Sequence, residues 1–368
     1  MPGKSVEAGE HGATNATTIQ ADALRHLTRA IFEAAGSEAA EADCIARYLV
    51  ESNLVGHDSH GVVRIPWYFE LMREGSLVPN REPKAILDGD TMAILDGQLG
   101  FGQVMAKRAT QMAIDKASQH GMAIVGLRNS GHVGRVGEWA VMAADAGMIT
   151  ISFVSTSGYA LLVAPHGGID RRLNANPIAI GIPIEGGPTI LADFSTCTIA
   201  HGKITVAGNK GTTVPDGCII DSEGRPTNDP DLFHADPGGA ILTLGAHKGY
   251  ALSIVIELLA NALTGGGCAQ PEVGRFEQSM LMIAFDPSKL RDGDAFGADA
   301  RQLTEFVKTS RTVGPDGEVL MPGEPEQRSR SRRLRDGIPI DATTWAQILE
   351  TSRALKMSPE SVDAIIGG

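Results

Sequence analysis

Three polar side chains follow one another at four-residue intervals in the stretch HDSHGVVRIPWYFELMREG, namely His60, Arg64 and Tyr68. An arginine can clamp a planar carboxylate through two parallel hydrogen bonds, and a histidine can exchange a proton near neutral pH. Four-residue spacing places side chains on one helix face. Because a proline is tolerated only in the first helical turn, Pro66 predicts a helix that begins near Ile65, with His60 and Arg64 on an irregular approach. In either arrangement an imidazole, a guanidinium and a phenol can converge on one small anionic substrate.

Two other interpretations of this stretch remain open. His57 and His60 could be two ligands of a metal ion, but no third ligand follows at a suitable spacing, so we predict no metal site. The same polar residues could also mark the exposed start of a surface helix that has no function of its own.

A second histidine lies among glycines in RNSGHVGRVGEWA, between the apolar run MAIVGL and a helical segment. A dinucleotide fingerprint requires GxGxxG directly after a strand and an acidic residue about twenty positions later. Here the spacing of Gly131, Gly134 and Gly137 is GxxGxxG, and ISFVSTSG offers only hydroxyls at the later position. The segment therefore argues against a Rossmann fold. His132 is either a polar group that lines a cleft or a structural loop histidine.

A third segment, GAHKGYALSIVIELLANALTG, is apolar nearly all round from Tyr250 onward, which predicts a buried helix. Its start carries His247, Lys248 and Gly249. Such a start would offer free N–H groups and a cation to an anion, for example a cofactor pyrophosphate, or would contact another segment as a cap. In LADFSTC, Asp193 could hold ribose hydroxyls or merely begin the next helix.

The elements that must position these residues fall into three stretches. Apolar residues at helical spacing predict helices between residues 18 and 54, each closed by a glycine, and again between 341 and 366. The middle, roughly 85 to 310, contains short β-rich runs such as ITISFV, PIAIGIPI and MLMIAF. Short turn-rich stretches separate several of them, which indicates antiparallel pairing and not a regular βα repeat. The charge run PEQRSRSRRLRD is predicted to be a solvated face or a mobile segment.

Composition narrows the class of protein. The chain has 368 residues and a formal net charge of −12, which argues against a nucleic-acid surface. No apolar run approaches the length that spans a bilayer, and the polar start has no hydrophobic region typical of a secretory signal. The four cysteines lie far apart and form no CxxC pair, as expected for free thiols in a reducing cytoplasm. We therefore expect a cytoplasmic protein without membrane or nucleic-acid partners.

Six segments together resemble the type 2 malate/L-lactate dehydrogenase family. In order along the chain they are DSHGVVRIPWY, RNSGHVGRVGEWA, NANPIAIGIP, DFSTCTIAHGKI, GAHKGYALSIVIELLANALTG and MPGEPE. The resemblance covers about residues 20 to 350. It implies an α/β fold with a non-Rossmann NAD(P)-binding domain around a largely antiparallel central sheet, together with a helical domain made from both chain ends. It also implies a homodimer. On this basis we expect a helical domain at 18–84 completed by 325–368, and an NAD(P)-binding and catalytic domain at 85–324.

The resemblance also suggests roles for individual residues. It implies that His60 is the proton donor, that Arg64 holds the substrate carboxylate and that Tyr68 lines the same pocket. Some family members are thought to use the histidine at position 132 as the base, so the choice between His60 and His132 stays open. The residues expected to contact the cofactor are Thr156, Asp193, Phe194, Ser195, His247, Lys248, Gly249, Pro322, Gly323 and Glu324.

This chain departs from the family pattern at two positions near His132. Many members carry a small or apolar residue where Arg135 stands, and asparagine or histidine is common where Gly131 stands. Arg135 could be a second cation for a dicarboxylate substrate, or a surface arginine.

We expect an NAD- or NADP-dependent oxidation of a small 2-hydroxycarboxylate to its 2-oxo acid. Reduction of a cyclic imine carboxylate is an alternative, as is a non-catalytic binding protein on the same scaffold. The sequence does not distinguish NAD from NADP.

Overall fold

The computed structural model describes residues 16–157, 161–184, 186–209, 211–270, 274–291 and 293–367. The chain divides into two compact units, one of Met1–Phe69 with Arg328–Gly368 and one of Glu70–Gln327. The polar N-terminal segment, for which no secretory signal is predicted, lies largely outside the described residues. Within the described ranges, no helix combines the length and the hydropathy that crossing a bilayer requires.

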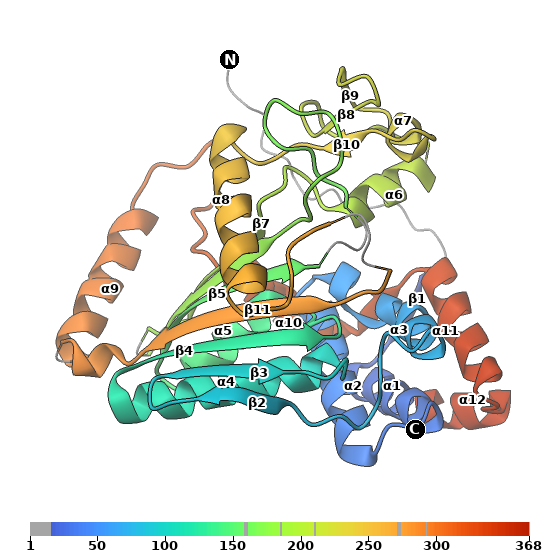
Figure 1. Cartoon of the computed structure of the whole chain (residues 1–368), viewed down its shortest axis with the longest axis horizontal. Coiled ribbons are helices and arrows are strands. Elements are labelled where there is room, and N and C mark those ends of the chain that lie inside the picture. The colour runs from blue at the N-terminus through green and yellow to red at the C-terminus, as the bar shows by residue number, and fades with distance from the viewer. Residues whose placement is uncertain are drawn as a thin grey trace. The chain divides into compact units, whose positions relative to one another are not determined.

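The first unit is helical and draws on both ends of the chain (Figure 1). Its elements are β1 (Thr17–Ile19), α1 (Ala21–Ala34), α2 (Ala39–Leu54), η1 (Asp58–His60), η2 (Val62–Arg64), β12 (Ile338–Ile340), α11 (Ala342–Ala354) and α12 (Pro359–Gly367), with most of α10 (Glu324–Asp336) and the first part of α3 (Ile65–Arg73). Strand β1 pairs antiparallel with β12, and α1 packs against both α2 and α12. The predicted helical part from both chain ends is therefore confirmed.

Local sequence signals set the ends of these helices. Gly36 and Gly56 follow α1 and α2 with φ angles of +104° and +88°, a conformation that glycine adopts without steric cost. At the start of α12, Ser358 Oγ accepts the backbone N–H of Ser361 at 3.1 Å and thereby caps the helix. Helix α3 begins at Ile65, as the position of Pro66 predicted.

The second unit is built on a seven-stranded sheet in the order β2-β3-β4-β11-β5-β6-β7. The strands are β2 (Lys84–Asp88), β3 (Met92–Asp96), β4 (Met122–Ser130), β5 (Ile149–Thr156), β6 (Pro177–Ile182), β7 (Ile190–Ser195) and β11 (Gln278–Phe285). Only the β3–β4 pair is parallel, and the other pairs of this sheet are antiparallel. The predicted α/β fold with a largely antiparallel sheet is confirmed.

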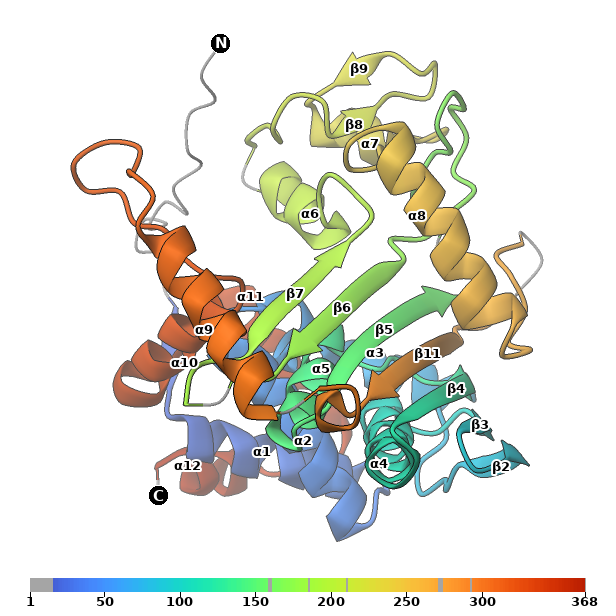
Figure 2. The ribbon, with the colours of Figure 1, turned by 90° about the vertical axis from the view of Figure 1, so that its left-hand side faces the viewer.

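Helices cover both faces of this sheet (Figure 2). One face packs against α4 (Gly102–His120) and α5 (Val136–Asp145), and the other against α8 (His247–Glu257) and the π-helical turn η3 (Leu258–Ala262). Strand alternation divides the core accordingly, because Ile151 and Phe153 face α8 whereas Val154 lies on the opposite side.

The remaining elements of the second unit lie outside this sandwich. They are α6 (His201–Asn209), β8 (Ile219–Ile220), β9 (Pro226–Thr227), α7 (Pro230–His234), β10 (Ala240–Ile241), η4 (Pro287–Lys289) and α9 (Gly293–Lys308). Strands β10, β8 and β9 form a small separate sheet.

The strand register gathers several loops at one edge of the large sheet. Strands β4 and β5 both run antiparallel to β11, so Ser130 and Thr156 end beside Gln278. Strand β6 starts at this edge with Pro177, which pairs with Ser195 at the end of β7. The loops after β4, β5 and β7 therefore open at the same edge, here called the site edge.

The sequence prediction that α8 is buried all round is wrong. Val255 and Leu258 are 46% and 53% exposed, whereas Ser253 and Ile256 on the other side are fully buried. One face of α8 packs on the sheet, and apolar residues of the opposite face are exposed.

Candidate functional site

His60 and Arg64 each end a short 3-10 turn, η1 and η2, directly before α3. Their backbone is held locally, since the His60 N–H donates to His57 O at 2.9 Å and the Arg64 N–H donates to Gly61 O at 3.0 Å. Ser59 Oγ lies 3.0 Å from His60 Nδ1. The approach to the helix is irregular, as predicted from Pro66.

The guanidinium of Arg64 is oriented by two contacts. Its Nε donates to the carbonyl oxygen of Ser59 at 2.6 Å, and its Cζ lies 5.1 Å from the ring centroid of Trp67. Within the described part of the chain, its two terminal nitrogens make no hydrogen bond. Burial lowers the pKa of Arg64 below its ordinary value, but an arginine stays charged at neutral pH. Its fork of terminal donors suits a carboxylate.

Tyr68 lies one turn into α3 and is 1% exposed. Its ring packs against Phe32 and Trp67, with centroid distances of 6.4 Å and 5.6 Å. The ring therefore belongs to the core of the helical unit.

Three glycines shape the His132 loop, and close packing explains two of them. A Cβ at Gly131 would stand 2.6 Å from a methyl carbon of Leu77, and one at Gly137 would stand 2.4 Å from Asp193 Oδ2. Gly134 has a φ angle of +78°, which requires the left-handed region. The GxxGxxG spacing therefore serves loop packing, in agreement with the rejected dinucleotide fingerprint.

His132 lies in this loop at the site edge and is 7% exposed, with its ring 6.3 Å from that of Phe276. Gln278 connects the loop to β5. Its Oε1 accepts the N–H of Val133 at 2.9 Å, and its Nε2 donates to Thr156 Oγ1 at 3.2 Å. Gln278 thus holds the His132 loop beside Thr156, a contact that the sequence analysis missed.

Arg135 is buried inside the second unit, with a side chain only 3% exposed. Its guanidinium lies 3.0 Å from Glu138 Oε2 and 3.9 Å from Asp193 Oδ2. Asp193 Oδ2 also accepts the N–H of Gly137 at 2.9 Å. Arg135 is therefore not a solvent-facing arginine, and its charge lies between the carboxylates of Glu138 on α5 and Asp193 on β7.

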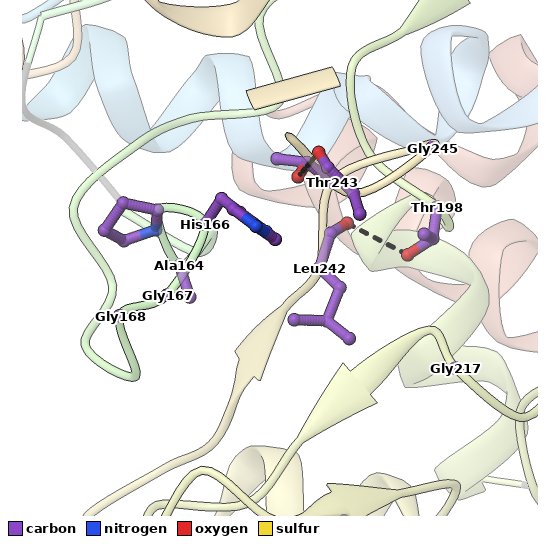
Figure 3. Close-up of a pocket in the computed structure, with 11 residues that line it drawn as sticks. Ala164, His166, Gly167, Gly168, Thr198, Gly217, Leu242, Thr243 and Gly245 are labelled. Atoms are coloured by element: carbon purple, nitrogen blue, oxygen red, sulfur yellow. Dashed lines mark hydrogen bonds between the residues drawn. The ribbon is translucent and has the colours of Figure 1, made fainter. Parts of the chain in front are cut away.

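The start of α8 borders a pocket of about 380 Å³ in the second unit (Figure 3). Small residues and backbone form most of its wall, and the His166 ring points into it (Figure 3). The rings of His166 and His247 lie 6.0 Å apart, and Lys248 is exposed beside them. The predicted free N–H groups are not all present, because those of Lys248 and Gly249 donate to Gly245 O and Leu244 O. Attraction of an anion there would depend mainly on the side chains.

Strand β7 brings two of the expected cofactor segments together. Asp193, Phe194 and Ser195 form its end at the site edge, and Phe194 is 44% exposed. Pro322 O accepts the N–H of Leu191 at 3.1 Å near the start of the same strand.

Gly323, next to Pro322, has a φ angle of +97°, and a Cβ there would lie 3.0 Å from Thr189 O. Glu324 Oε2 accepts the N–H of Met321 at 2.9 Å, and its other oxygen pairs with Lys308. The segment 322–324 therefore lies beside the start of β7, at the opposite end of the strand from Ser195.

A buried carboxylate that the sequence analysis missed lies beneath the site edge. Glu257, at the end of α8, is 5% exposed and accepts Asn176 Nδ2 at 3.0 Å, Asn261 Nδ2 at 3.0 Å and the N–H of Ala269 at 2.6 Å. Ser155 Oγ lies 2.5 Å from its Oε2 and precedes Thr156. The sequence signal for it was a single acidic residue in an otherwise apolar helix. A carboxylate that is buried with such a helix needs several hydrogen-bond donors from other segments.

Comparison with known proteins assigns the family. The model of the malate/L-lactate dehydrogenase family matches residues 19–349. Hydroxycarboxylate dehydrogenase B of Escherichia coli (strain K12) is 38% identical over 94% of this chain and 96% of its own length. L-lactate dehydrogenase of Cupriavidus necator is 35% identical over 92% of this chain and 98% of its own length. The structure of sulfolactate dehydrogenase from Methanocaldococcus jannaschii superposes with a TM-score of 0.83 at 31% identity, covering 94% of this chain and 99% of that one. The chain therefore belongs to the malate/L-lactate dehydrogenase family.

Proposed function

We propose that this member of a family of hydroxycarboxylate dehydrogenases oxidises a small 2-hydroxycarboxylate of the malate or lactate type reversibly to its 2-oxo acid, with NAD or NADP. The pairing of His60 and Arg64 on successive turns carries the proposal. A 2-hydroxy acid presents a carboxylate next to the carbon that is oxidised, so it needs a cation and a proton carrier a short distance apart.

On the substrate side, the terminal nitrogens of Arg64 bind the carboxylate in this proposal, while Nε stays engaged with Ser59 O. His60 gives its proton to the substrate oxygen during reduction and takes it back during oxidation. The hydroxyl of Tyr68 contacts the same substrate. His132 is the rival proton carrier. Arg135 acts on the substrate only indirectly, because its charge is already paired with Glu138 and Asp193.

On the cofactor side, a bound nicotinamide nucleotide supplies or accepts the hydride. The α8 pocket suits an anionic cofactor, since His166 lines its wall of small residues, and His247 and Lys248 directly follow Ala246, another lining residue. We propose that the cofactor is held by Thr156, Asp193, Phe194, Ser195, His247, Lys248, Gly249, Pro322, Gly323 and Glu324.

We further propose that residues 85–324 act as the NAD(P)-binding and catalytic domain, and that residues 18–84 with 325–368 act as the helical domain. The protein is inferred to work as a cytoplasmic homodimer whose other partner is its carboxylate substrate.

The proposal is tested by following the absorbance of reduced nicotinamide. Malate, lactate and sulfolactate are offered with NAD and NADP, and their 2-oxo acids and a cyclic imine carboxylate with the reduced cofactors. Turnover of at least one hydroxy acid and its 2-oxo acid is expected. Turnover of the imine alone would instead assign an imine reductase, and cofactor binding without any turnover would assign a binding protein.

The cofactor assignment has a separate test. Lys248→Ala should raise the dissociation constant for NADH or NADPH, measured by fluorescence titration. Lys203→Ala, an exposed lysine on α6, removes the same charge elsewhere in the second unit and is the control. Equal dissociation constants for wild type and Lys248→Ala would contradict the assignment.

A further inference from the structure

The charge run predicted to be solvated or mobile forms helix α10, and one face of it is engaged. Ser329 Oγ donates to Leu54 O at 3.0 Å, and Arg330 Nε donates to Glu51 Oε1 at 2.6 Å. Arg333, one turn after Ser329, reaches Asp58. No residue of α10 is buried, so the charge run is largely solvated as predicted. One face of the helix nevertheless contacts α2 and the η1 turn within the helical unit.

Arg333 makes a two-point contact with a single carboxylate. Its Nη1 and Nη2 donate to Asp58 Oδ1 at 2.6 Å and to Oδ2 at 3.0 Å. Nη1 also donates to the carbonyl oxygen of Asn53. The Arg333 side chain is only 12% exposed. A bidentate guanidinium fixes the plane of its partner as well as its distance, which a lysine cannot do.

Asp58 is the first residue of the turn that ends at His60, and the turn is also held from α2. Asn53, 2% exposed, donates from Nδ2 to Asp58 Oδ1 at 2.7 Å and accepts the N–H of Val62 on Oδ1 at 2.9 Å. A Cβ at Gly61 would stand 2.1 Å from Asn53 Oδ1, so only glycine fits. The turn therefore lies between α2 and α10, with Arg333 as its contact from the far end of the chain.

We propose that Arg333 is a positioning residue that holds the His60 turn in its working geometry through Asp58. This inference rests on the proposed role of His60 as the proton carrier. Without the guanidinium, Asp58 keeps only Asn53 among the side chains described as bonding it, and the turn can shift. A shift of about 1 Å in a reacting group can cost roughly 100-fold in rate.

The kinetic test compares two alanine variants of the same helix. Arg333→Ala should lower kcat by about 10- to 100-fold, with the dissociation constant for the reduced cofactor unchanged. Arg330→Ala also removes an ion pair between α10 and α2 but leaves Asp58 untouched, so its kcat should stay within about twofold of wild type. Equal losses in both variants, or no loss in Arg333→Ala, would overturn the proposal.

A spectroscopic measurement separates this inference from the proposed function. The His60 ring signal in the ¹³C-labelled protein, assigned by its absence in His60→Gln, should move in Arg333→Ala and stay in place in Arg330→Ala. Asp58→Asn should reproduce the shift. An unmoved signal in both Arg333→Ala and Asp58→Asn refutes the positioning role. If the signal moves but no substrate is turned over, the proposed function fails while the positioning of the turn stands.

Arg333→Lys covers the case in which the alanine variant does not fold. Because lysine keeps the charge and loses the second hydrogen bond, it should give a kcat between those of wild type and Asp58→Asn. A lysine variant with wild-type kcat and an unmoved His60 signal would refute the need for two-point contact.

Discussion

His60 and His132 are both imidazoles in glycine-containing turns, but their surroundings differ. His60 ends a 3-10 turn next to an arginine with two uncommitted terminal nitrogens among the described residues. His132 is 7% exposed in a loop held to Gln278. The neighbourhood of Arg64 favours His60 as the proton carrier, because the substrate carboxylate and the oxygen that gains a proton belong to adjacent carbons.

This difference gives a kinetic prediction. A general acid contributes roughly 10²- to 10⁴-fold in rate, so His60→Gln should lower kcat by that order with cofactor binding intact. Arg64→Lys should chiefly raise KM, because its carboxylate contact also forms in the ground state. Steady-state kinetics over a range of pH provide the measurement. The assignment would pass to His132 if His132→Gln abolished turnover while His60→Gln kept most of its kcat and its pH profile.

Arg135 differs from Arg64, since its guanidinium is already paired with carboxylates inside the protein. Breaking a buried ion pair by removing one partner costs about 3–5 kcal/mol in the free energy of unfolding, because the remaining charges are left uncompensated. We expect Arg135→Met to show a loss of this order in denaturant unfolding and similar fractional losses of kcat/KM for malate and lactate. A selective loss for malate at unchanged stability would instead make Arg135 a substrate-binding residue.

At the scale of elements, α8 is positioned by the carboxylate at its own end. Burying the carboxylate of Glu257 costs free energy that its hydrogen-bond donors must offset. It joins α8 to the start of β6 through Asn176 and to the end of β5 through Ser155. The end of α8 and the end of β5, which carries Thr156, are thus parts of one hydrogen-bonded assembly.

Removing this carboxylate should loosen the assembly. Each buried donor left without a partner costs about 1–3 kcal/mol, so Glu257→Ala should lower the free energy of unfolding by at least about 3 kcal/mol. It should also weaken binding of the reduced cofactor. Glu305→Gln, at an exposed position on α9, is the control for both measurements. Wild-type stability in Glu257→Ala would mean that water replaces the lost acceptor.

At the scale of the whole molecule, α9 presents exposed apolar side chains. Leu303 and Phe306 are 60% and 73% exposed. Together with the homodimer that family resemblance implies, this surface predicts that α9 contributes to contact with a second copy.

Phe306→Glu should therefore weaken self-association by at least about tenfold, because a charge would replace a large ring that contact with the second copy would bury. Light scattering coupled to gel filtration should then show the mass falling toward the 38.7 kDa of one chain. Glu305→Lys, on the side of α9 away from Leu303, should leave the mass unchanged. A monomeric wild type, or a dimeric Phe306→Glu variant, would contradict the prediction.

The sequence by itself determined the local structure of this protein. The helices near both termini, the start of α3 and the cap of α12 follow from apolar spacing, Pro66 and Ser358, which act within a few residues. The antiparallel sheet and the rejected dinucleotide fingerprint also followed from short connections and glycine spacing. The candidate residues could be named because their chemistry and their motifs are readable one segment at a time.

Only the tertiary structure decided which distant groups meet. Nothing near Arg135 in the sequence reveals Asp193, and nothing near Asp58 reveals Arg333, because these pairs depend on strand register and on how α10 packs. The exposed face of α8 was missed for the same reason, since an apolar sequence does not say whether another segment will cover it. Long-range packing, and not local propensity, assigns each charged group its partner.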